Sequence, residues 1–442
     1  MLSIESPRWG LEVEEALFDS ANQPTTVQMG DQVMNTFSPD PSLDVLDTMP
    51  RTVGGLLDDG RAVTLFDAQE TGTGWDPFGS KKQRFGGWRV LFGALLSGLD
   101  APVAGVRWTL PRWPGLRFNG EASCRGGSLA SYTHDEHPGI CLILDRPEPV
   151  GRAAEMIPHR ISTLLTIASG AAVEPVHREV LLPDGTWATF GADRPSPTTH
   201  ISSDLVAPAA IDLPAMAAWT DESGDLGPLP FIVASALTAT LQSDAQSLAA
   251  ALEGLHRRLH RDKKPFATVS RKGLRRAVLA AANAGANQLA MEGWTDTEFA
   301  RSRFEQSLNH VGQMSYADRL SALLEPVACV APGLFGPHLD VWVRNMSTVR
   351  NVQSHQLTEH DDFGEQEIAL YFVLGQSAAW ALRIALLARV FPEEALRTGL
   401  TASSRFAYTL ANIDAEQVWS GYSCSAAFRQ STLSVATPPE SH

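Results

Sequence analysis

The chain has 442 residues, of which 44% are apolar, and its formal net charge is −15 at pH 7. This length allows two or three domains with cores of their own, and the apolar content excludes a disordered chain. A surface this acidic repels polyanions on average, so binding of nucleic acid requires a local basic patch.

The N-terminus and the cysteines indicate the compartment. Residues 1–18 contain neither a basic segment nor an apolar core of the kind that a signal peptide needs. The cysteines form neither a Cys-x-x-Cys pair nor a zinc-binding pattern with histidine. They are Cys124, Cys141, Cys329 and Cys424. We therefore expect reduced thiols in a cytoplasmic protein.

The N-terminal part, up to about residue 220, is rich in Gly and Pro, with short apolar runs between turn signals. "TVGGLLDDGRAVTLF" predicts a strand, an Asp-Asp-Gly turn and a second strand. Residues 159–169 fit either a helix or a buried strand. The Gly-flanked basic segment 79–88 predicts a mobile loop. We expect a β-rich domain over residues 1–225.

From about Pro228 the apolar residues follow a helical period. Long helical patterns cover residues 229–260, 267–290 and 338–352, and Thr295 to Glu298 have the spacing of a capping box. The sequence predicts an all-α domain over residues 226–436. The fold class is then α+β, with a β-rich domain followed by a helical bundle.

The most apolar segment, residues 367–391, raises the question of a membrane span. It contains Glu367, Gln376, Arg383 and Arg389, which a bilayer core disfavours. We therefore expect a buried bundle helix and no membrane partner.

Two Arg-Asn pairs lie in the pattern 338–352, and helical phase separates them. At about 100° per residue, one apolar stripe runs along this helix. The stripe contains Leu339, Trp342, Val343, Met346 and Val349. Arg344 falls opposite the stripe, in solvent. Arg350 falls at its edge, where helices meet.

His355 follows Arg350 by five positions, which is about 140° around a continuous helix. The two side chains can converge only if the helix ends or bends between them. Asn351 and Ser354 favour such an end, so we predict a break near residues 351–357. The simpler alternative is that Arg350 caps helix carbonyls and that His355 is a loop residue.

The Arg-x4-His motif at a helix end resembles the HEPN superfamily of the ApeA-like type. "ALEGLHRRLH", "YADRLSALLEPV" and the long apolar helix after the motif are similar to ApeA-like HEPN domains. "TVGGLLDDGRAVTLFDA" and "ISTLLTIASGAAVEPVHREV" resemble the ApeA N-terminal domain. The likeness spans roughly residues 50–430.

This resemblance implies a metal-independent endoribonuclease toxin of anti-phage defence, acting by abortive infection. RNA supplies the 2′-OH as nucleophile, His355 would be the general acid or base, and Arg350 would hold the phosphate. Asn351 would contact the phosphate or orient His355. Such sites are usually completed in a homodimer. The N-terminal domain would sense a phage-derived trigger or restrain the nuclease. The alternative is a catalytically inactive HEPN module for dimerisation or partner binding.

A basic cluster in residues 257–276 offers a surface for RNA, with tRNA one candidate. Its members are Arg257, Arg258, Arg261, Lys263, Lys264, Arg271, Lys272, Arg275 and Arg276. A solvated corner between two helices explains the same charges equally well.

Other motifs indicate no cofactor. "HDEH", His134 to His137, could hold a metal, but a polar loop is the favoured interpretation. His256 and His260 have the i, i+4 spacing of metal ligands, but neighbouring arginines favour a basic surface instead. No phosphate-binding glycine loop is present, and no Gly-x-Ser-x-Gly motif.

Overall fold

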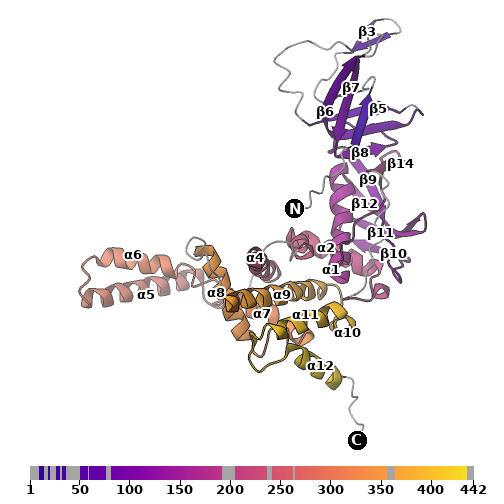
Figure 1. The fold of residues 1–442 in the computed structure, drawn as a ribbon. Coiled ribbons are helices and arrows are strands. Elements are labelled where there is room, and N and C mark those ends of the chain that lie inside the picture. Colours follow the sequence, from indigo (N-terminus) through magenta and orange to yellow (C-terminus); the bar gives the residue numbers. More distant parts are fainter. Residues whose placement is uncertain are drawn as a thin grey trace. The chain divides into compact units, whose positions relative to one another are not determined.

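The computed structural model describes most of the chain. The described residues are 9–13, 18–19, 26–29, 32–35, 50–57, 59–75, 81–191, 205–235, 241–261, 264–355 and 364–435. The chain divides into two compact units, Met1–Gly224 and Asp225–His442. We call them the β unit and the helical unit, and each is described by itself (Figure 1).

The β unit is built on an antiparallel sheet. Its strands are β1 (Trp9–Val13), β2 (Phe18–Asp19), β5 (Arg51–Leu56), β6 (Ala62–Trp75), β7 (Lys81–Gly87), β8 (Arg89–Phe92), β9 (Pro102–Thr109), β10 (Glu121–Cys124), β11 (Gly127–His134), β12 (His137–Pro149), β13 (Arg178–Leu181) and β14 (Trp187–Phe190). The order is β1-β7-β6-β8-β14-β13-β9-β12-β11-β10, with β5 joining β2 to β6. A separate hairpin pairs β3 (Thr26–Met29) with β4 (Gln32–Asn35).

One helix resolves an ambiguity of the sequence. A π-helical turn, η2 (Arg152–Met156), contacts β9, β12 and β13 and leads into α1 (Ile157–Ser169). Residues 159–169 are therefore helical. Ile161, Leu164 and Leu165 are fully buried, as expected of a helix that covers a sheet. After α1 the chain returns to β13 and β14 and then forms η3 (Pro208–Ala210) and α2 (Leu213–Leu226).

The predicted mobile loop at residues 79–88 is wrong. Most of this segment is β7, which pairs antiparallel with β6 on one side and β1 on the other. The glycines and lysines disfavour a strand locally, but the partner β6 is 14 residues long and supplies a ladder of hydrogen bonds. Phe85 anchors this strand, since its side chain is only 1% exposed.

The helical unit contains ten described helices. They are α3 (Leu229–Ala234), α4 (Leu241–Leu259), α5 (Arg271–Met291), α6 (Thr297–Leu308), α7 (Tyr316–Val330), α8 (Leu339–His355), α9 (Glu365–Leu387), α10 (Glu393–Ala402), α11 (Ser404–Ala415) and α12 (Cys424–Val435). The fold class is the predicted one, a β-rich part followed by a helical bundle.

Helix α9 is the core of this unit, with α4, α7, α8 and α11 packed around it. It is long and apolar enough to cross a membrane, but 83% of its apolar window is buried inside the unit. This burial agrees with the bundle helix expected from the sequence.

Two helix starts differ in their caps. Helix α7 begins with a capping box between Ser315 and Asp318. The box predicted at Thr295 to Glu298 is wrong, because Asp296 caps α6 by accepting a hydrogen bond from the backbone N–H of Phe299. The short acidic side chain at position 296 is the better acceptor for that N–H.

Helices α5 and α6 form a hairpin that extends away from the other helices of the unit (Figure 1). Its described residues bury only the small side chains Ala282, Ala286 and Ala300 completely. The hairpin is therefore held mainly by its own two helices, and most of its surface faces solvent.

Candidate functional site

Helix α8 has the predicted phase. Trp342, Val343, Met346 and Val349 are buried, and the Trp342 indole donates a hydrogen bond of 2.7 Å to Ser377 Oγ of α9. Arg344 lies on the opposite side with a side chain that is 72% exposed. The side chain of Arg350 is 39% exposed, as expected at the edge of the apolar stripe.

The sequence predicts a break near residues 351–357, and the described part of α8 shows none before His355. Helix α8 continues through residue 355, so the two positions are about 140° apart around its axis. Each residue with low helix propensity costs only about 0.7 kcal/mol, which cooperative extension of a formed helix overcomes. The side chain of His355 and residues 356–363 lie outside the described residues.

The Arg350 guanidinium contacts two other helices. Its Nη2 lies 3.2 Å from the Oε2 atom of Glu253 on α4. Its central carbon lies 4.9 Å from the centre of the Tyr316 ring at the start of α7. The Tyr316 hydroxyl donates a 3.2 Å hydrogen bond to the Ala249 carbonyl oxygen of α4. These contacts hold the guanidinium while leaving part of it open to solvent.

Glu253 also pairs with two further arginines. Arg257 donates to Oε1 from Nη2 at 2.7 Å, and Arg319 donates to the same oxygen. We call Glu253, Arg257, Tyr316, Arg319 and Arg350 the Glu253 cluster. Three arginines of the described residues pair with this one carboxylate on a partly exposed surface.

The protonation states in the cluster follow from its charges. Burial raises the pKa of Glu253, but hydrogen bonding with Arg257 and the charges of Arg350 and Arg319 outweigh burial and lower it overall. Burial raises the pKa of Tyr316, against the effect of the Arg350 charge. Glu253 is therefore ionised and Tyr316 neutral at pH 7. The cluster can bind an anion, but a proton donor or acceptor must come from elsewhere.

Sequence reasoning missed Glu253, Tyr316 and Arg319. All three lie in the two segments that carry the family likeness, and a signal was present there. Glu253 adjoins the apolar stripe of α4, and Arg319 adjoins the apolar stripe of α7. Charges of opposite sign therefore lie at the edges of two helix faces that pack into the core. Such charges usually pair with each other when the helices pack.

The predicted RNA-binding residues separate into two groups. Arg257 belongs to the Glu253 cluster, and Arg258 donates to the Leu226 carbonyl oxygen. Lys263 lies outside the described residues. The other members of the predicted set are exposed; they are Arg261, Lys264, Arg271, Lys272, Arg275 and Arg276. Asn351, next to Arg350 on α8, is also exposed.

Three of these exposed residues share a pocket of about 730 Å³ between α5 and the end of α6. Arg271, Lys272 and Arg275 line it together with Asn309 and Gly312. All three cations belong to the first two turns of α5. A helix N-terminus already carries partial positive charge, so an anion bound there relieves the repulsion between that charge and the three cationic side chains.

The structure places the histidine pairs at a turn and at the end of a helix. Asp135 and Glu136 have φ angles of 48° and 64°, and they form the tight turn between β11 and β12. His256 is buried rather than on a basic surface, with its ring centre 4.7 Å from that of His260. No cluster of three or more His, Cys, Asp or Glu side chains suited to a metal occurs within the described ranges.

The family of the helical unit is shown by a sequence match. Residues 247–390 match the model of the family described as Apea-like HEPN. This part of the chain is an ApeA-like HEPN domain, and it includes most of α4, all of α5 to α9, the whole Glu253 cluster and His355. HEPN domains are generally ribonucleases, and the match suggests a nuclease or defence type of module. No curated protein and no solved structure matches the chain.

Proposed function

We propose that this protein is a cytoplasmic, metal-independent endoribonuclease toxin of bacterial anti-phage defence, acting by abortive infection. The observation that carries the proposal is the partly exposed Arg350 guanidinium, which the Glu253 cluster holds in place. This cluster lies in a domain whose family members are generally ribonucleases.

The chemistry needs two protein groups. A base removes the proton of the RNA 2′-OH, the oxygen attacks the adjacent phosphorus, and the bond to the 5′ oxygen of the next nucleotide breaks. The products are a 2′,3′-cyclic phosphate and a 5′-OH, which takes up a proton. Arg350 neutralises the charge of the phosphorane, because its guanidinium can hold two phosphate oxygens.

His355 is the proposed proton-transfer group, because its ordinary pKa lies near neutrality. The continuous α8 separates it from Arg350 within one chain. We therefore place the site in a homodimer, in which Arg350 of one protomer faces His355 of the other. Asn351, exposed beside Arg350, contacts the phosphate or orients that histidine.

RNA reaches the site along the basic face of the helical unit. The exposed cations Arg271, Lys272 and Arg275 contact phosphates at the base of the α5–α6 hairpin. Cleavage should act on RNA, tRNA included, and spare DNA, which lacks the 2′-OH. The β unit senses a phage-derived trigger or restrains the nuclease.

The test is cleavage of RNA by the purified protein in EDTA, with sequencing of the RNA ends. Wild type should leave cyclic-phosphate ends. Arg350→Ala and His355→Ala should each lower cleavage by about a hundredfold or more and abolish growth toxicity on induced expression. Arg344→Ala, an exposed arginine on the same helix, should behave as wild type. Full activity in both site variants would rule out this mechanism.

A second function, a catalytically inactive HEPN module for dimerisation or partner binding, is favoured by one observation. Arg350 already pairs with Glu253, so its role can be structural. This alternative predicts no cleavage under any trigger and a lowered melting temperature in Arg350→Ala. Unchanged melting with lost toxicity in His355→Ala favours catalysis.

A further inference from the structure

The α5–α6 hairpin carries opposite charges at its two ends. Residues 263–276, which precede and begin α5, contain six cations and no acidic residue. Residues 277–300 contain Glu292, Asp296 and Glu298 and no Lys or Arg. Cations in the first turns of α5 and an acid at its end oppose the helix dipole. Because these charges do not stabilise α5 itself, contacts with another molecule explain them better.

The tip of the hairpin is apolar and held in shape. Leu289, Met291, Trp294 and Phe299 are all exposed there, and Met291 is 75% exposed. The Trp294 indole donates a 2.7 Å hydrogen bond to the Asp296 carbonyl oxygen, and its ring centre lies 6.4 Å from that of Phe299. An apolar surface that is already fixed favours docking on another protein, since little conformational freedom is lost when it is covered.

The base of the hairpin has the complementary properties. Its pocket of about 730 Å³ is lined by Arg271, Lys272 and Arg275 together with three apolar side chains, Leu274, Val278 and Val311. Just before α5, Phe266 and Val269 add exposed apolar surface. A pocket of this size can receive an aromatic side chain, and aromatic residues seated in pockets are frequent anchors of protein interfaces.

The charges at the two ends are not balanced among the described residues. Arg271, Lys272 and Arg275 form no ion pair there. The one acidic residue that lines their pocket, Glu305, pairs with Arg301 at 3.6 Å. At the tip, Glu298 lies 3.8 Å from Arg301 but is 89% exposed, and such an exposed pair contributes little. The base therefore keeps a positive excess and the tip a negative one.

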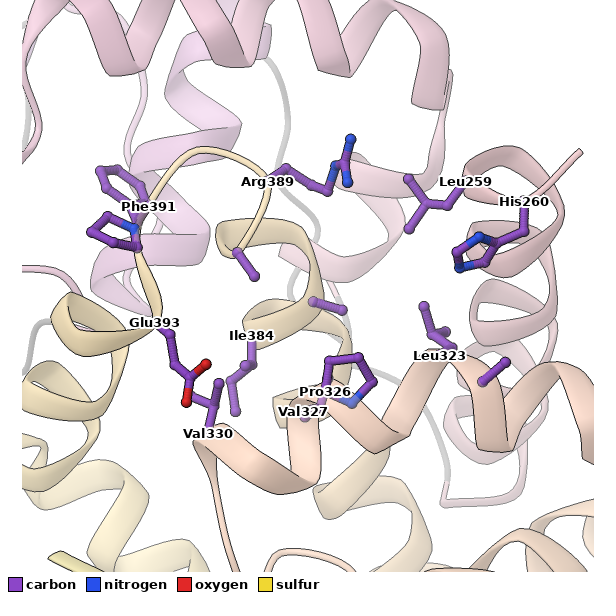
Figure 2. Close-up of a pocket in the computed structure, with 14 residues that line it drawn as sticks. Leu259, His260, Leu323, Pro326, Val327, Val330, Ile384, Arg389, Phe391 and Glu393 are labelled. Atoms are coloured by element: carbon purple, nitrogen blue, oxygen red, sulfur yellow. The ribbon is translucent and has the colours of Figure 1, made fainter. Parts of the chain in front are cut away.

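A second pocket of the helical unit lacks this excess. It has a volume of about 580 Å³ and opens between the ends of α4 and α9 and the second half of α7 (Figure 2). Apart from His260, its charged lining residues are one arginine and one glutamate, Arg389 and Glu393, which lie apart from each other in Figure 2. An acidic tip therefore finds its match at the base of α5 and not in this pocket.

We propose that two copies of this chain pair their hairpins in opposite directions, so that the apolar, acidic tip of each docks in the basic pocket at the base of the other. Twofold symmetry makes the same contact twice. Trp294 is the anchor that enters the pocket, and the tip carboxylates face the cations around it. Tip and base of one hairpin cannot meet, because α5 keeps them about 30 Å apart.

The pairing has a consequence for RNA. It covers Arg271, Lys272 and Arg275, the cations that contact RNA in the proposed function. The paired form is therefore a resting state in which RNA and the second copy compete for one surface. This regulatory part rests on the proposed nuclease function, whereas the pairing itself does not. The hairpin contact is also distinct from the contact that would bring Arg350 to His355.

Zero-length crosslinking tests the contact directly. Carbodiimide joins a carboxylate to a lysine amine that it touches, and mass spectrometry of the full chain identifies the joined peptides. Lys272 and Glu292 should become linked, and this link must join two copies, since about 30 Å of α5 separates the two positions in one chain. A chain that sediments as a monomer up to about 100 µM would overturn the proposal. So would association without any link between base and tip.

Reversing the charges at either end provides a stricter test. One variant carries Glu292→Lys and Glu298→Lys, and the other carries Arg271→Glu, Lys272→Glu and Arg275→Glu. Each alone should lose the association step that wild type shows in sedimentation, because like charges then meet. A mixture of the two should regain this step and form the link between positions 272 and 292. Undiminished association of either variant alone, or no such link in the mixture, would overturn the proposal.

The apolar anchor is tested with matched controls. Trp294→Ala should weaken the pairing at least tenfold, as measured by sedimentation, and should leave the melting temperature nearly unchanged. Tyr408→Ala removes an exposed aromatic side chain of α11, and Glu394→Lys with Glu416→Lys makes the same change of charge outside the hairpin. Both controls should pair as wild type does. Pairing of Trp294→Ala as strong as that of the controls would overturn the docking of the tip.

The regulatory part is read in a chain with Arg350→Ala, which leaves RNA largely uncut. Single-stranded RNA should abolish the link between positions 272 and 292. Adding Trp294→Ala should raise the apparent RNA affinity at least threefold at protein concentrations at which the parent is paired. RNA binding that leaves the link unchanged overturns the resting-state role. A chain that pairs but never binds RNA counts against the nuclease function and against this role, while the pairing stands.

Discussion

The Arg350 guanidinium lies 3.2 Å from the Glu253 carboxylate, and the two residues are 97 positions apart in the chain. The contact joins α8 to α4, the helix at which the HEPN match begins. Because Glu253 also holds Arg257 and Arg319, the position of Arg350 depends on three helices at once. This dependence makes the arginine testable through its neighbours as well as directly.

Two replacements of Arg350 should separate the effect of its positive charge from the effect of its planar, two-pronged contact with phosphate. Arg350→Ala should lower RNA cleavage by roughly 10²- to 10³-fold, the usual loss when one group that stabilises transition-state charge is removed. Arg350→Lys keeps the charge, but a lysine cannot hold two phosphate oxygens at once as the planar guanidinium does. The activity of this variant should therefore fall between those of wild type and Arg350→Ala. Initial rates on a fluorescent RNA in EDTA measure both effects.

A matched structural control is available on the neighbouring helix α9. Ser377→Ala removes the buried partner of the Trp342 indole and should cost about 1–3 kcal/mol of unfolding free energy. Its cleavage rate, measured well below its melting temperature, should stay near wild type. A loss of cleavage in Ser377→Ala equal to that in Arg350→Ala would mean that stability, not the guanidinium, sets the rate.

Much of the helical unit was predictable because its signals are local. The apolar stripe of α8 fixes which of Arg344 and Arg350 meets the other helices, and the structure confirms that phase. The partners of Arg350 were not predictable in this way, because Glu253 and Tyr316 come from helices whose packing no local pattern specifies. The expected convergence of positions 350 and 355 within one chain fails for a related reason: residues with weak helix propensity do not by themselves stop a helix, and α8 continues to His355.

Glu253→Gln should make stability less sensitive to acid. Ion pairing lowers the pKa of Glu253 in the folded protein, so its contribution is present above the ordinary value of about 4.5 and is lost as pH falls through the folded pKa. At pH 7 the variant should lose about 1–3 kcal/mol of unfolding free energy. Urea unfolding at pH 7 and pH 3.5 should show the difference from wild type shrinking in acid. A constant difference would mean that the carboxylate charge is not what stabilises the cluster.

The basic pocket at α5 should govern how RNA binding depends on salt. Combined replacement of Arg271, Lys272 and Arg275 by Gln removes three phosphate contacts, and each contributes about 0.7 to the slope on single strands. The slope of log affinity against log salt should therefore fall in magnitude by about 2, as measured by fluorescence anisotropy. The same change at Arg344, Arg405 and Arg429, three exposed arginines of the helical unit, should leave the slope nearly unchanged.

Mixing two inactive variants should show whether the site is shared between protomers. Positions 350 and 355 are about 140° apart on a continuous helix, so one chain presents them to different faces. In a dimer of Arg350→Ala with His355→Ala, one composite site keeps both groups and the other loses both. Random exchange of equal amounts makes half of the dimers mixed, so activity should return to about a quarter of wild type.

The stoichiometry of this rescue is the decisive measurement. Each variant alone should stay inactive at every concentration, and the rescued rate should peak at equal amounts of the two. A mixture of His355→Ala with the double variant carrying both substitutions is the control and should remain inactive, because no dimer in it contains His355. If the first mixture also fails although mass spectrometry shows mixed dimers, then Arg350 and His355 either act within one chain or are both needed in duplicate. The shared single-site arrangement is then wrong.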